Sequence, residues 1–294
     1  MPDPSAHSAF DAQALAAFRQ LVLQQGRLLF RDLPWRRTTD PYQIWISEVM
    51  LQQTQVQRVD GRWQRWLERF PTVDALAMAQ VADVLDEWQG MGYNRRALAL
   101  LNAARAVSDA GGVMPHELRE LVALPGIGSA TAAGIRAFAF NLPGVYLETN
   151  VRTVMLHEFY PDAAQVPDRE LIPLVEATCP QDACDPNDDP RTWYYALLDY
   201  GYHLKRTVPN PSRRSRTHVR QSRFEGSHRQ KRAMVVRALL AHRDGASAET
   251  LAQEVAAEER LAGREPVGEA YVLELLQELA AEGFCRNENG IWHP

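Results

Sequence analysis

Two glutamates and one asparagine have the residue types and surroundings that acid–base chemistry requires. Glu48 lies in a helical pattern whose neighbours, Val49 and Met50 among them, are apolar. Apolar surroundings raise the pKa of a carboxyl group, which suits a proton donor. The alternative, a solvent-facing acid on an amphipathic helix, stays open at this point. Glu148 lies further along the chain, beyond a glycine-containing turn at Leu124–Gly128. Asn150, two residues after Glu148, is expected to cap the next helix.

The glycine turn is Leu124–Gly128, with the sequence LPGIG, and a run of small residues from Ser129 to Phe140 follows it. This pattern predicts a helix, a tight hairpin and a second helix. Glycine permits a positive φ and a close backbone approach, and the N–H groups that begin the second helix form an anion site. A phosphate fits there, although an ordinary helical corner explains the same residues. Just beyond such a hairpin, Glu148 stands where chemistry on a nucleotide requires an acid.

Charge is unevenly distributed along the chain. The net charge is −5, yet the stretch from His203 to Arg232 carries ten Lys or Arg against one acid. We call this stretch the basic strip. A basic strip on an acidic body can hold a polyanion locally while the protein stays soluble. A solvated charged linker is the alternative.

Composition limits the class of protein. A chain of 294 residues is long enough for two domains. No apolar run approaches the roughly 18 residues that span a bilayer, and the N-terminus lacks a signal-peptide pattern, so we expect a cytoplasmic, nucleoid-associated protein without a membrane partner. The three cysteines have no metal-binding spacing, which predicts no metal site. Lysine occurs only twice, as Lys205 and Lys231, which leaves few amines for Schiff-base chemistry.

Helical periodicity dominates the first two hundred or so residues, and period-2 strand patterns are missing there. We therefore predict an all-α body, an extended segment from Lys205 to Gly226, and a winged-helix-like module of three helices with a short hairpin at Asn289-Gly290. The acidic balance of residues 233–294 favours a partner or support role for that module. The predicted helices are Asp11–Phe30, Tyr42–Val59, Gly61–Arg69, Thr72–Ala77, Val81–Trp88, Arg95–Ala110, Ser129–Phe140, Val151–Tyr160, Glu170–Thr178, Thr192–Tyr202, Gln230–His242, Ala248–Glu259 and Glu269–Glu282.

Five motifs in order resemble the helix–hairpin–helix base-excision DNA glycosylases, and within them the MutY adenine glycosylases, with endonuclease III as a broader relative. The resemblance covers roughly residues 25–205. It implies a two-lobed helix–hairpin–helix fold and a monomeric DNA repair enzyme that flips a damaged or mispaired base out of double-stranded DNA. The motifs are Leu33-Pro34-Trp35, the run SEVMLQQTQV from Ser47 to Val56, Gly90-Met91-Gly92-Tyr93, Leu124–Gly128 and Leu147–Val151.

Carried over residue by residue, the resemblance assigns roles. It implies that Glu48 is the general acid, that Glu148 stabilises the positive sugar, and that Asn150 lines the same pocket. Gln53 is implied to fill the gap left by the flipped base, and Tyr93 and Ala130 to line the pocket. The expected DNA-binding residues, which include arginines of the basic strip, are Gln52, Gln53, Gly126, Ile127, Gly128, Ser129, Thr131, Arg213, Arg214 and Arg216.

Three departures from the family pattern shape the expectation. Glu148 stands where the family has aspartate, and Thr149 where it usually has glycine. Ala130 replaces the hairpin-helix lysine with which endonuclease III cleaves the strand, which implies a monofunctional enzyme. The places of the four iron–sulfur cysteines are held by non-thiolate residues, so we expect no cluster and no other cofactor, with a monovalent cation at the hairpin left open. Those places are Lys205, Ser212, Ser215 and Gln221.

The expected organisation is a glycosylase domain over residues 1–204, a basic extended segment in place of the iron–sulfur loop over 205–228, and the winged-helix-like module over 229–294. The expected activity is hydrolysis of an N-glycosidic bond without strand cleavage, with adenine favoured because Glu48 can supply the proton that a purine leaving group needs. Two alternatives remain: a glycosylase for mismatched uracil or thymine, and a catalytically impaired protein that binds lesions.

Overall fold

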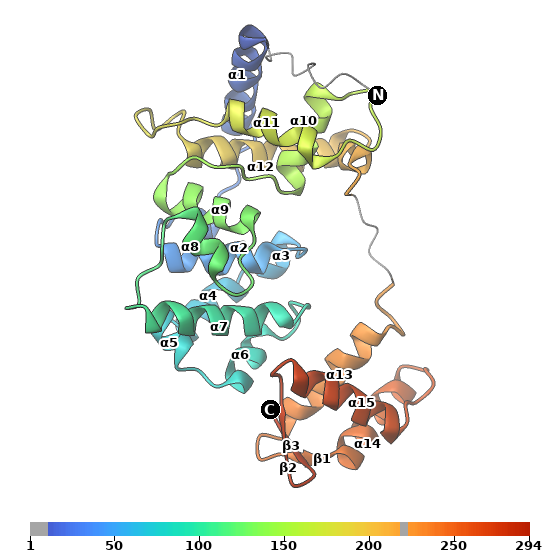
Figure 1. The fold of residues 1–294 in the computed structure, drawn as a ribbon. Helices are drawn as coiled ribbons and strands as arrows, with labels where there is room; N and C mark the ends of the chain where they lie inside the picture. The colour runs from blue at the N-terminus through green and yellow to red at the C-terminus, as the bar shows by residue number, and fades with distance from the viewer. Residues whose placement is uncertain (1–10, 218–222) are drawn as a thin grey trace, which may run out of the picture. The chain divides into compact units, whose positions relative to one another are not determined.

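A computed structural model of the chain describes residues 11–217 and 223–294, which are mostly helical (Figure 1). Packing divides the chain into two units. The first is made by the described parts of Met1–Glu48, Pro115–Ala123 and Ile127–Arg220, and the second by Val49–Met114, Leu124–Gly126 and the described part of Gln221–Pro294. Within the described ranges, no helix has the length and apolar character needed to cross a membrane.

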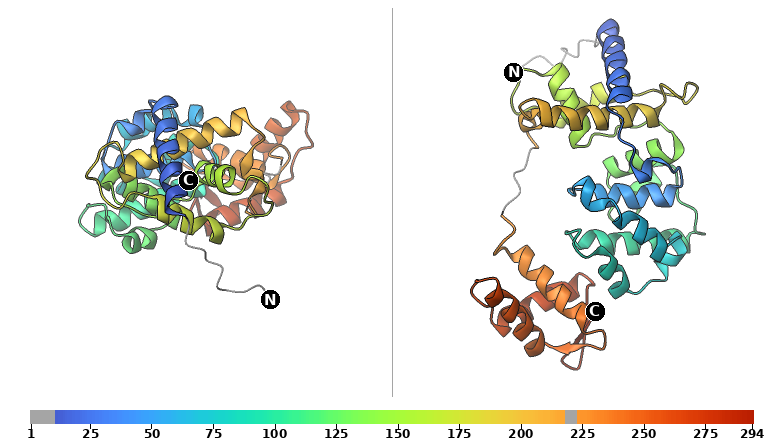
Figure 2. Two further views of the ribbon diagram at one scale, coloured as in Figure 1. Left: turned by 90° about the horizontal axis from the view of Figure 1, so that it is seen from above. Right: turned by 180° about the vertical axis from the view of Figure 1, so that it is seen from behind.

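The first unit is built around one long helix, α12 (Pro190–Thr207), which packs against α1 (Ala12–Leu28) and α10 (Thr149–Phe159). Figures 1 and 2 show α1 and α12 side by side. A Cβ on Gly26 would lie 2.4 Å from the Cβ of Ala196, so only glycine permits this close helix contact. The remaining elements are η1 (Pro34–Arg36), α2 (Pro41–Leu51) as far as Glu48, α8 (Leu118–Ala123), α9 (Ser129–Phe140), α11 (Asp168–Thr178) and η2 (Pro211–Arg214).

The second unit contains a helical lobe in which α7 (Arg95–Asp109) packs against α5 (Val73–Ala77) and α6 (Val81–Trp88). Its core includes the edge-to-face pair of Trp66 and Trp88, whose ring centroids are 5.6 Å apart. Two further helices complete the lobe, α3 (Val56–Val59) and α4 (Arg62–Arg69).

The single helix predicted over Tyr42–Val59 is wrong, because α2 (Pro41–Leu51) ends early and α3 begins only at Val56. Arg96 supplies the physical reason. Its buried guanidinium donates hydrogen bonds to the carbonyl oxygens of Val49 at 2.8 Å and Gln52 at 2.5 Å. These carbonyls are satisfied without a continuing helix, so the chain can turn between the two helices.

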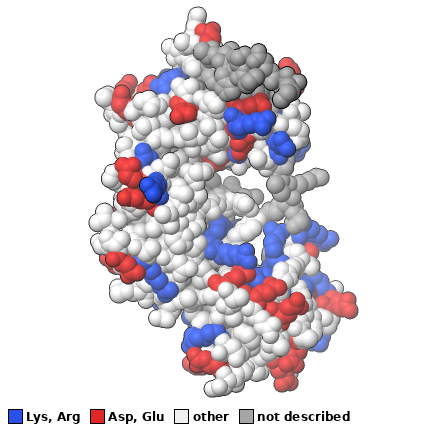
Figure 3. Space-filling model, viewed as in Figure 1, with Lys and Arg blue, Asp and Glu red and all other residues white. Residues whose placement is uncertain are grey.

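The C-terminal elements form three helices with a small sheet: α13 (His228–Ala241), α14 (Ala248–Leu261) and α15 (Glu269–Ala281), with β1 (Ala246–Ser247), β2 (Arg286–Glu288) and β3 (Ile291–His293). The sheet is antiparallel in the order β1-β3-β2. Asn289 and Gly290 both have positive φ, as a two-residue hairpin turn requires. The helices and the hairpin match the predicted winged-helix outline. Acidic and basic side chains interleave over these elements (Figure 3).

The extended segment predicted over Lys205–Gly226 is corrected at its start. Helix α12 continues to Thr207, and η2 follows at Pro211–Arg214. The backbone N–H of Arg216 then donates to the carbonyl of Val166 at 3.0 Å. The start of the basic strip is therefore ordered structure packed against α10, because local hydrogen bonds hold it there.

Candidate functional site

Glu148 is the N-cap of α10, a position that the sequence had assigned to Asn150. Its side chain accepts hydrogen bonds from the backbone N–H groups of Asn150 and Val151, the latter at 2.9 Å. The positive end of the helix dipole and these two donors favour the ionised carboxylate. The helix therefore begins earlier than predicted, and the acid is held by the backbone of its own first turn.

Glu48, near the end of α2, has its carboxyl group against Tyr146 and Gly134. The hydroxyl of Tyr146 donates to Oε2 of Glu48 at 3.0 Å. A Cβ on Gly134, in the middle of α9, would lie 2.3 Å from the same oxygen and 2.8 Å from the Tyr146 ring. The glycine in this helix therefore makes room for the carboxyl group and its hydrogen-bond partner.

Burial separates the two acids from ordinary surface carboxylates. It raises the pKa of Glu48 to about 8, although the hydrogen bond from Tyr146 acts in the opposite direction and Glu148 adds a smaller upward effect. Burial also raises the pKa of Glu148, opposed first by the N–H of Val151 and then by the charge of Lys205. A pKa near 8 would suit Glu48 to proton donation at neutral pH, while Glu148 has several groups that favour its anion.

An aromatic cluster fixes Tyr146. Its backbone N–H donates to the hydroxyl of Tyr194 at 3.2 Å, and the Tyr194 hydroxyl donates in turn to the carbonyl oxygen of Gly144. The Tyr146 ring meets Phe138 edge-on, with centroids 5.3 Å apart. The group that holds the Glu48 carboxyl is therefore itself held by hydrogen bonds and packing, as a preorganised site requires.

Asn150 lies in the first turn of α10 against Gly201 of α12. A Cβ on Gly201 would lie 2.2 Å from the carbonyl oxygen of Asn150. The Asn150 amide donates to the Glu148 carboxyl at 3.2 Å, and its own Oδ1 is buried with no hydrogen-bond partner. The first unit therefore brings together all three residues predicted to be catalytic, and within its described part the Asn150 Oδ1 acceptor has no donor.

The predicted hairpin is present at Leu124–Gly128. Gly126 has φ +74°, and a Cβ there would lie 2.5 Å from the Cβ of Ala99. No side chain caps α9 at Gly128, which is exposed together with Ser129. Ile127 and Thr131 are buried and Ala130 is half-buried, so the exposed surface of this turn is mainly backbone.

In the second unit, Arg96 organises the turns that carry Gln53, predicted to fill the gap left by the flipped base, and Tyr93, predicted to line the pocket. Gln53 and Tyr93 both have positive φ, 51° and 50°, which is rare for residues other than glycine. Gln53 is exposed, and Gln52 is held through its carbonyl by Arg96. The Arg96 guanidinium also donates to the carbonyl of Gly92 at 3.1 Å. Strained backbone held by a buried cation is a feature of functional turns.

The arginines of the basic strip do not all face outward. The Arg214 guanidinium donates to the carbonyl oxygens of Leu156, at 2.9 Å, and Pro161, so its prediction as a phosphate ligand is corrected. Arg213 and Arg216 are exposed. Lys231 and Arg232 pair with acids of the C-terminal elements. Arg220, which belongs to the same predicted strip, lies outside the described residues.

The positions that the resemblance assigns to iron–sulfur ligands carry no thiol groups. The Ser212 hydroxyl donates to Asn210 at 2.8 Å, and the Ser215 hydroxyl lies 2.8 Å from that of Thr217. Lys205 offers an ammonium group, and Gln221 lies outside the described residues. Hydroxyl and ammonium groups are not thiolate ligands. Among the described residues, no group of three or more His, Cys, Asp or Glu side chains is placed to hold a metal ion.

Sequence reasoning did not find several residues that shape the site. Four of them contact partners that are far away in the chain, and hydrophobic periodicity does not reveal such contacts. They are Tyr146, Gly134, Gly201 and Arg96. A glycine inside a helical pattern was the available signal for Gly134 and Gly201, because such a glycine usually has a packing reason.

Residues 46–172 match the family described as HhH-GPD superfamily base excision DNA repair protein. An adenine DNA glycosylase of Mycolicibacterium smegmatis is 39% identical over 173 residues, which are 58% of this chain and 57% of that protein. The chain spans about half the length of the curated relatives it matches.

Two solved structures are similar in fold. A thermostable thymine-DNA glycosylase superposes with a TM-score of 0.55 and 25% identity, covering 64% of this chain and 86% of that one. A non-covalent endonuclease III–DNA complex gives a TM-score of 0.51 at 18% identity, covering 64% and 84%. The second likeness is one of fold alone. Together with the family match, these structures confirm the predicted helix–hairpin–helix fold.

Proposed function

We propose that this chain, which contains a domain of the HhH-GPD superfamily of base excision DNA repair proteins, is a DNA glycosylase that removes adenine from mispaired or damaged duplex DNA. The observation that carries the proposal is the pair of unlike acids in the first unit. Glu48 is protonated at neutral pH and Glu148 is held at a helix N-terminus, in a region similar to adenine DNA glycosylases.

The chemistry of the pair suits cleavage of a purine N-glycosidic bond. Glu48 donates its proton to a ring nitrogen of the base, which makes the base a better leaving group. The C–N bond breaks with its electron pair moving to the base, and the Glu148 carboxylate stabilises the positive charge that develops on the sugar. Water then adds to the sugar carbon and loses a proton, which leaves an abasic site and an intact strand.

DNA binding is part of the same proposal. The exposed backbone of the Leu124–Gly128 hairpin is a suitable contact for a phosphate, and exposed Arg213 and Arg216 are suitable for further phosphates. Gln53 and Tyr93 are proposed to contact the opened base stack, because both occupy strained and exposed turns.

We also propose that the protein works without an iron–sulfur cluster, since Ser212 and Ser215 are committed to hydrogen bonds where the family has thiolates. Purified protein should contain no stoichiometric iron and show no absorbance near 400 nm. Iron at one cluster per chain would overturn this part of the proposal.

A panel of duplexes with one target base each tests the function. Wild type should generate alkali-sensitive sites at adenine opposite guanine or 8-oxoguanine, and should leave the strand intact without alkali. Glu48→Gln and Glu148→Gln should each lower base release by about a hundredfold to ten thousandfold, with duplex affinity retained. Release of thymine or uracil alone would favour a pyrimidine glycosylase. Tight binding with no release of any base would leave only a lesion-binding role.

Glu148→Asp tests how the site accommodates the longer acid. Aspartate would have to cap α10 from one methylene further away, and a displacement of about 1 Å can cost a hundredfold in rate. Because the Glu148 carboxyl already bonds two backbone N–H groups, we expect the aspartate variant to be slower than wild type. A faster aspartate variant would show that the site is not adapted to glutamate.

A further inference from the structure

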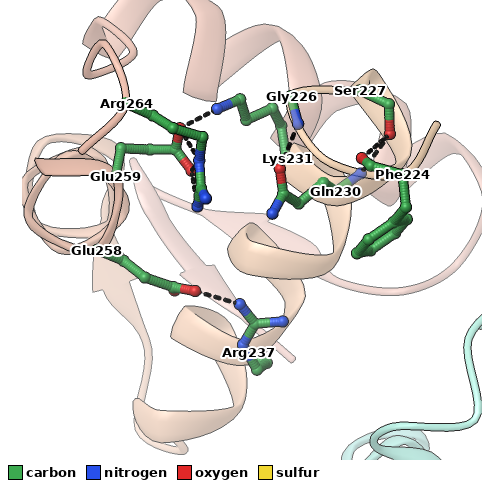
Figure 4. A network of polar contacts seen from close by, with 9 residues as sticks. All are labelled: Phe224, Gly226, Ser227, Gln230, Lys231, Arg237, Glu258, Glu259 and Arg264. Atoms are coloured by element: carbon green, nitrogen blue, oxygen red, sulfur yellow. Dashed lines mark hydrogen bonds and ion pairs between the residues drawn. The ribbon is translucent and has the colours of Figure 1, made fainter. Parts of the chain in front are cut away.

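Each of the two lysines in this chain lies close enough to a glutamate to lower the pKa of its carboxyl group. The sequence has two lysines among 32 basic residues, so arginine serves almost everywhere else. Lys231 is buried and forms an ion pair with Glu259, whose side chain is fully buried (Figure 4). Lys205 is half-buried, on α12. An ammonium group is more compact than a guanidinium, so lysine can approach a buried carboxylate where space is short.

Helix packing places Lys205 on the face of α12 that meets the start of α10. Gly201 contacts the backbone of Asn150, in the first turn of α10, so closely that a Cβ there would overlap it. Lys205 is four residues further along α12 and therefore lies on the same face of that helix. Glu148 caps the same end of α10 that this face meets.

The charges of the two groups influence each other. Burial lowers the pKa of Lys205, and the nearby Glu148 carboxylate acts in the opposite direction. The pKa of Glu148 is raised by burial and lowered, after its hydrogen bond from Val151, by the charge of Lys205. Each group therefore favours the charged form of the other, as expected for two opposite charges in a site that excludes most water.

Other charged groups around Glu148 do not replace this cation. Arg152 also lowers the pKa of Glu148, but its guanidinium is paired with both oxygens of Asp168, at 3.0 and 2.8 Å. Arg31, which lowers the pKa of Lys205, is paired with Asp199 at 2.5 Å. Glu48 and Tyr146, on the other side, carry no positive charge. Within residues 11–217 and 223–294, Lys205 has no salt bridge of its own, so its charge is available to Glu148.

We propose that Lys205 is a positioning residue for base release, and that its ammonium group is the counter-ion that keeps the Glu148 carboxylate ionised in its buried place. This role rests on the proposed glycosylase function. The resemblance assigns the position of Lys205 to an iron–sulfur ligand. In the proposed role, the residue at this position instead keeps Glu148 ionised.

The test compares Lys205→Met with Lys205→Arg in the full chain. Single-turnover base release is measured against pH with enzyme in excess over an adenine mispair duplex. Lys205→Met should move the acid limb of the profile, which reports ionisation of Glu148, to higher pH by about one unit, so that the rate on that limb falls about tenfold. Lys205→Arg should restore most of the limb. Arg206→Met, which removes a charge from the neighbouring residue, should leave the limb in place.

A second readout does not depend on catalysis. Titration of ¹³C-labelled glutamate carboxyl groups, followed by NMR, reports the ionisation of Glu148 even if no base is released. An upward shift of that titration in Lys205→Met, with Lys205→Arg close to wild type, supports the proposal. An unchanged titration overturns it, even if wild type releases adenine. If wild type releases no base and the titration still shifts, the counter-ion role holds and the proposed function fails.

Trapping with borohydride on an abasic duplex separates a charge role from a covalent one. The counter-ion role predicts no adduct, because the ammonium group stays protonated beside Glu148. An adduct formed by wild type and lost in Lys205→Met would overturn the proposal, since the amine would then be a nucleophile.

Discussion

Each unit of this molecule holds a glutamate carboxyl group away from solvent, fully in the case of Glu259 and partly in the case of Glu48, and the two sites treat it in opposite ways. Glu259 has a fully buried side chain that accepts hydrogen bonds from Arg264 and Lys231, and these cations, Arg264 foremost, lower its pKa to about 2. Figure 4 shows both cations converging on its carboxylate. Among the described residues, Glu48 has the Tyr146 hydroxyl as its hydrogen-bond partner and no cation paired with it, and burial raises its pKa to about 8.

The difference separates structural from functional burial. A buried carboxylate with two cations is an anion at any physiological pH and serves to hold helices together. A buried carboxyl with a single hydroxyl partner retains its proton near neutrality and can donate it. The chain neutralises the buried carboxylate of Glu259 with two cations. The lack of a cation paired with Glu48 among the described residues therefore favours a functional reason for leaving this acid protonated.

The largest loss of stability should come from a change at Glu259, the carboxylate that two cations neutralise. Glu259→Gln leaves Lys231 without its buried partner, and losing one partner of a buried pair costs about 3–5 kcal/mol. Urea unfolding and hydrogen exchange of the α13 and α14 amides measure the loss. Glu258→Gln is the matched control, because Glu258 pairs with Arg237 at 2.6 Å on the exposed side and should cost about 0–1 kcal/mol. Equal effects of the two changes would contradict the structural role of Glu259.

The space around Glu48 provides the next test. Gly134→Ala places a methyl group against the carboxyl and the Tyr146 ring, which must then move. Since a shift of about 1 Å can cost a hundredfold in rate, base release should fall by that order, with little change in duplex binding. Gly144→Ala, whose Cβ would meet Ala133 at an ordinary 3.7 Å, should leave the rate within a fewfold of wild type. A Gly134→Ala enzyme as active as this control would mean that Glu48 needs no such fit.

The arginines allow the same comparison for cations. Arg214 bonds backbone carbonyls, so Arg214→Ala should destabilise the protein by about 1–3 kcal/mol and leave the salt dependence of duplex binding unchanged. Arg213→Ala and Arg216→Ala should instead each reduce the slope of log K against log salt by about 0.9. Thermal unfolding and binding at several salt concentrations measure both. If Arg214→Ala lowered the slope and the other two did not, the assignment of these arginines would be reversed.

The smallest effect concerns stability at the functional site. The folded-state pKa of Glu48, about 8, lies above its ordinary 4.5, so the folded protein loses stability as pH rises from about 4.5 through 8. Because Glu48→Gln cannot ionise, its free energy of unfolding should exceed that of wild type above pH 8 and should differ little from it at pH 5. Scanning calorimetry at pH 5 and pH 9 checks it. A variant less stable than wild type at pH 9 would contradict the unneutralised state of Glu48.

Local patterns predicted much of the fold and part of the site. The helix Ser129–Phe140 and the hairpin before it follow from small residues and two glycines, and both are present as predicted. The apolar residues beside Glu48 in the sequence predicted a raised pKa, although Tyr146 and Gly134, which lie against its carboxyl group, are far away in the chain. These features depend on short-range order, which periodicity and turn chemistry record.

The remaining features depend on contacts between residues far apart in the chain. Arg96 ends α2 by binding its carbonyl groups, which no pattern within Tyr42–Val59 reveals. Arg214 turns inward because carbonyl groups at the end of α10 accept its hydrogen bonds. The role proposed for Lys205 depends on α12, whose Gly201 packs against Asn150. The sequence identifies the charge that such a residue carries, but the folded structure is needed to identify the group with which it interacts.

The most direct test of the account is the pH dependence of adenine release by wild type, measured as kcat/KM so that it reports the free enzyme. The account predicts a bell-shaped profile. Its alkaline limb should fall near pH 8 as Glu48 loses its proton, and its acid limb should lie above pH 4.5 as Glu148 becomes protonated. Glu48→Gln should lack activity across the range. A rate that stays level or rises through pH 8, or a Glu48→Gln enzyme as fast as wild type, would contradict it.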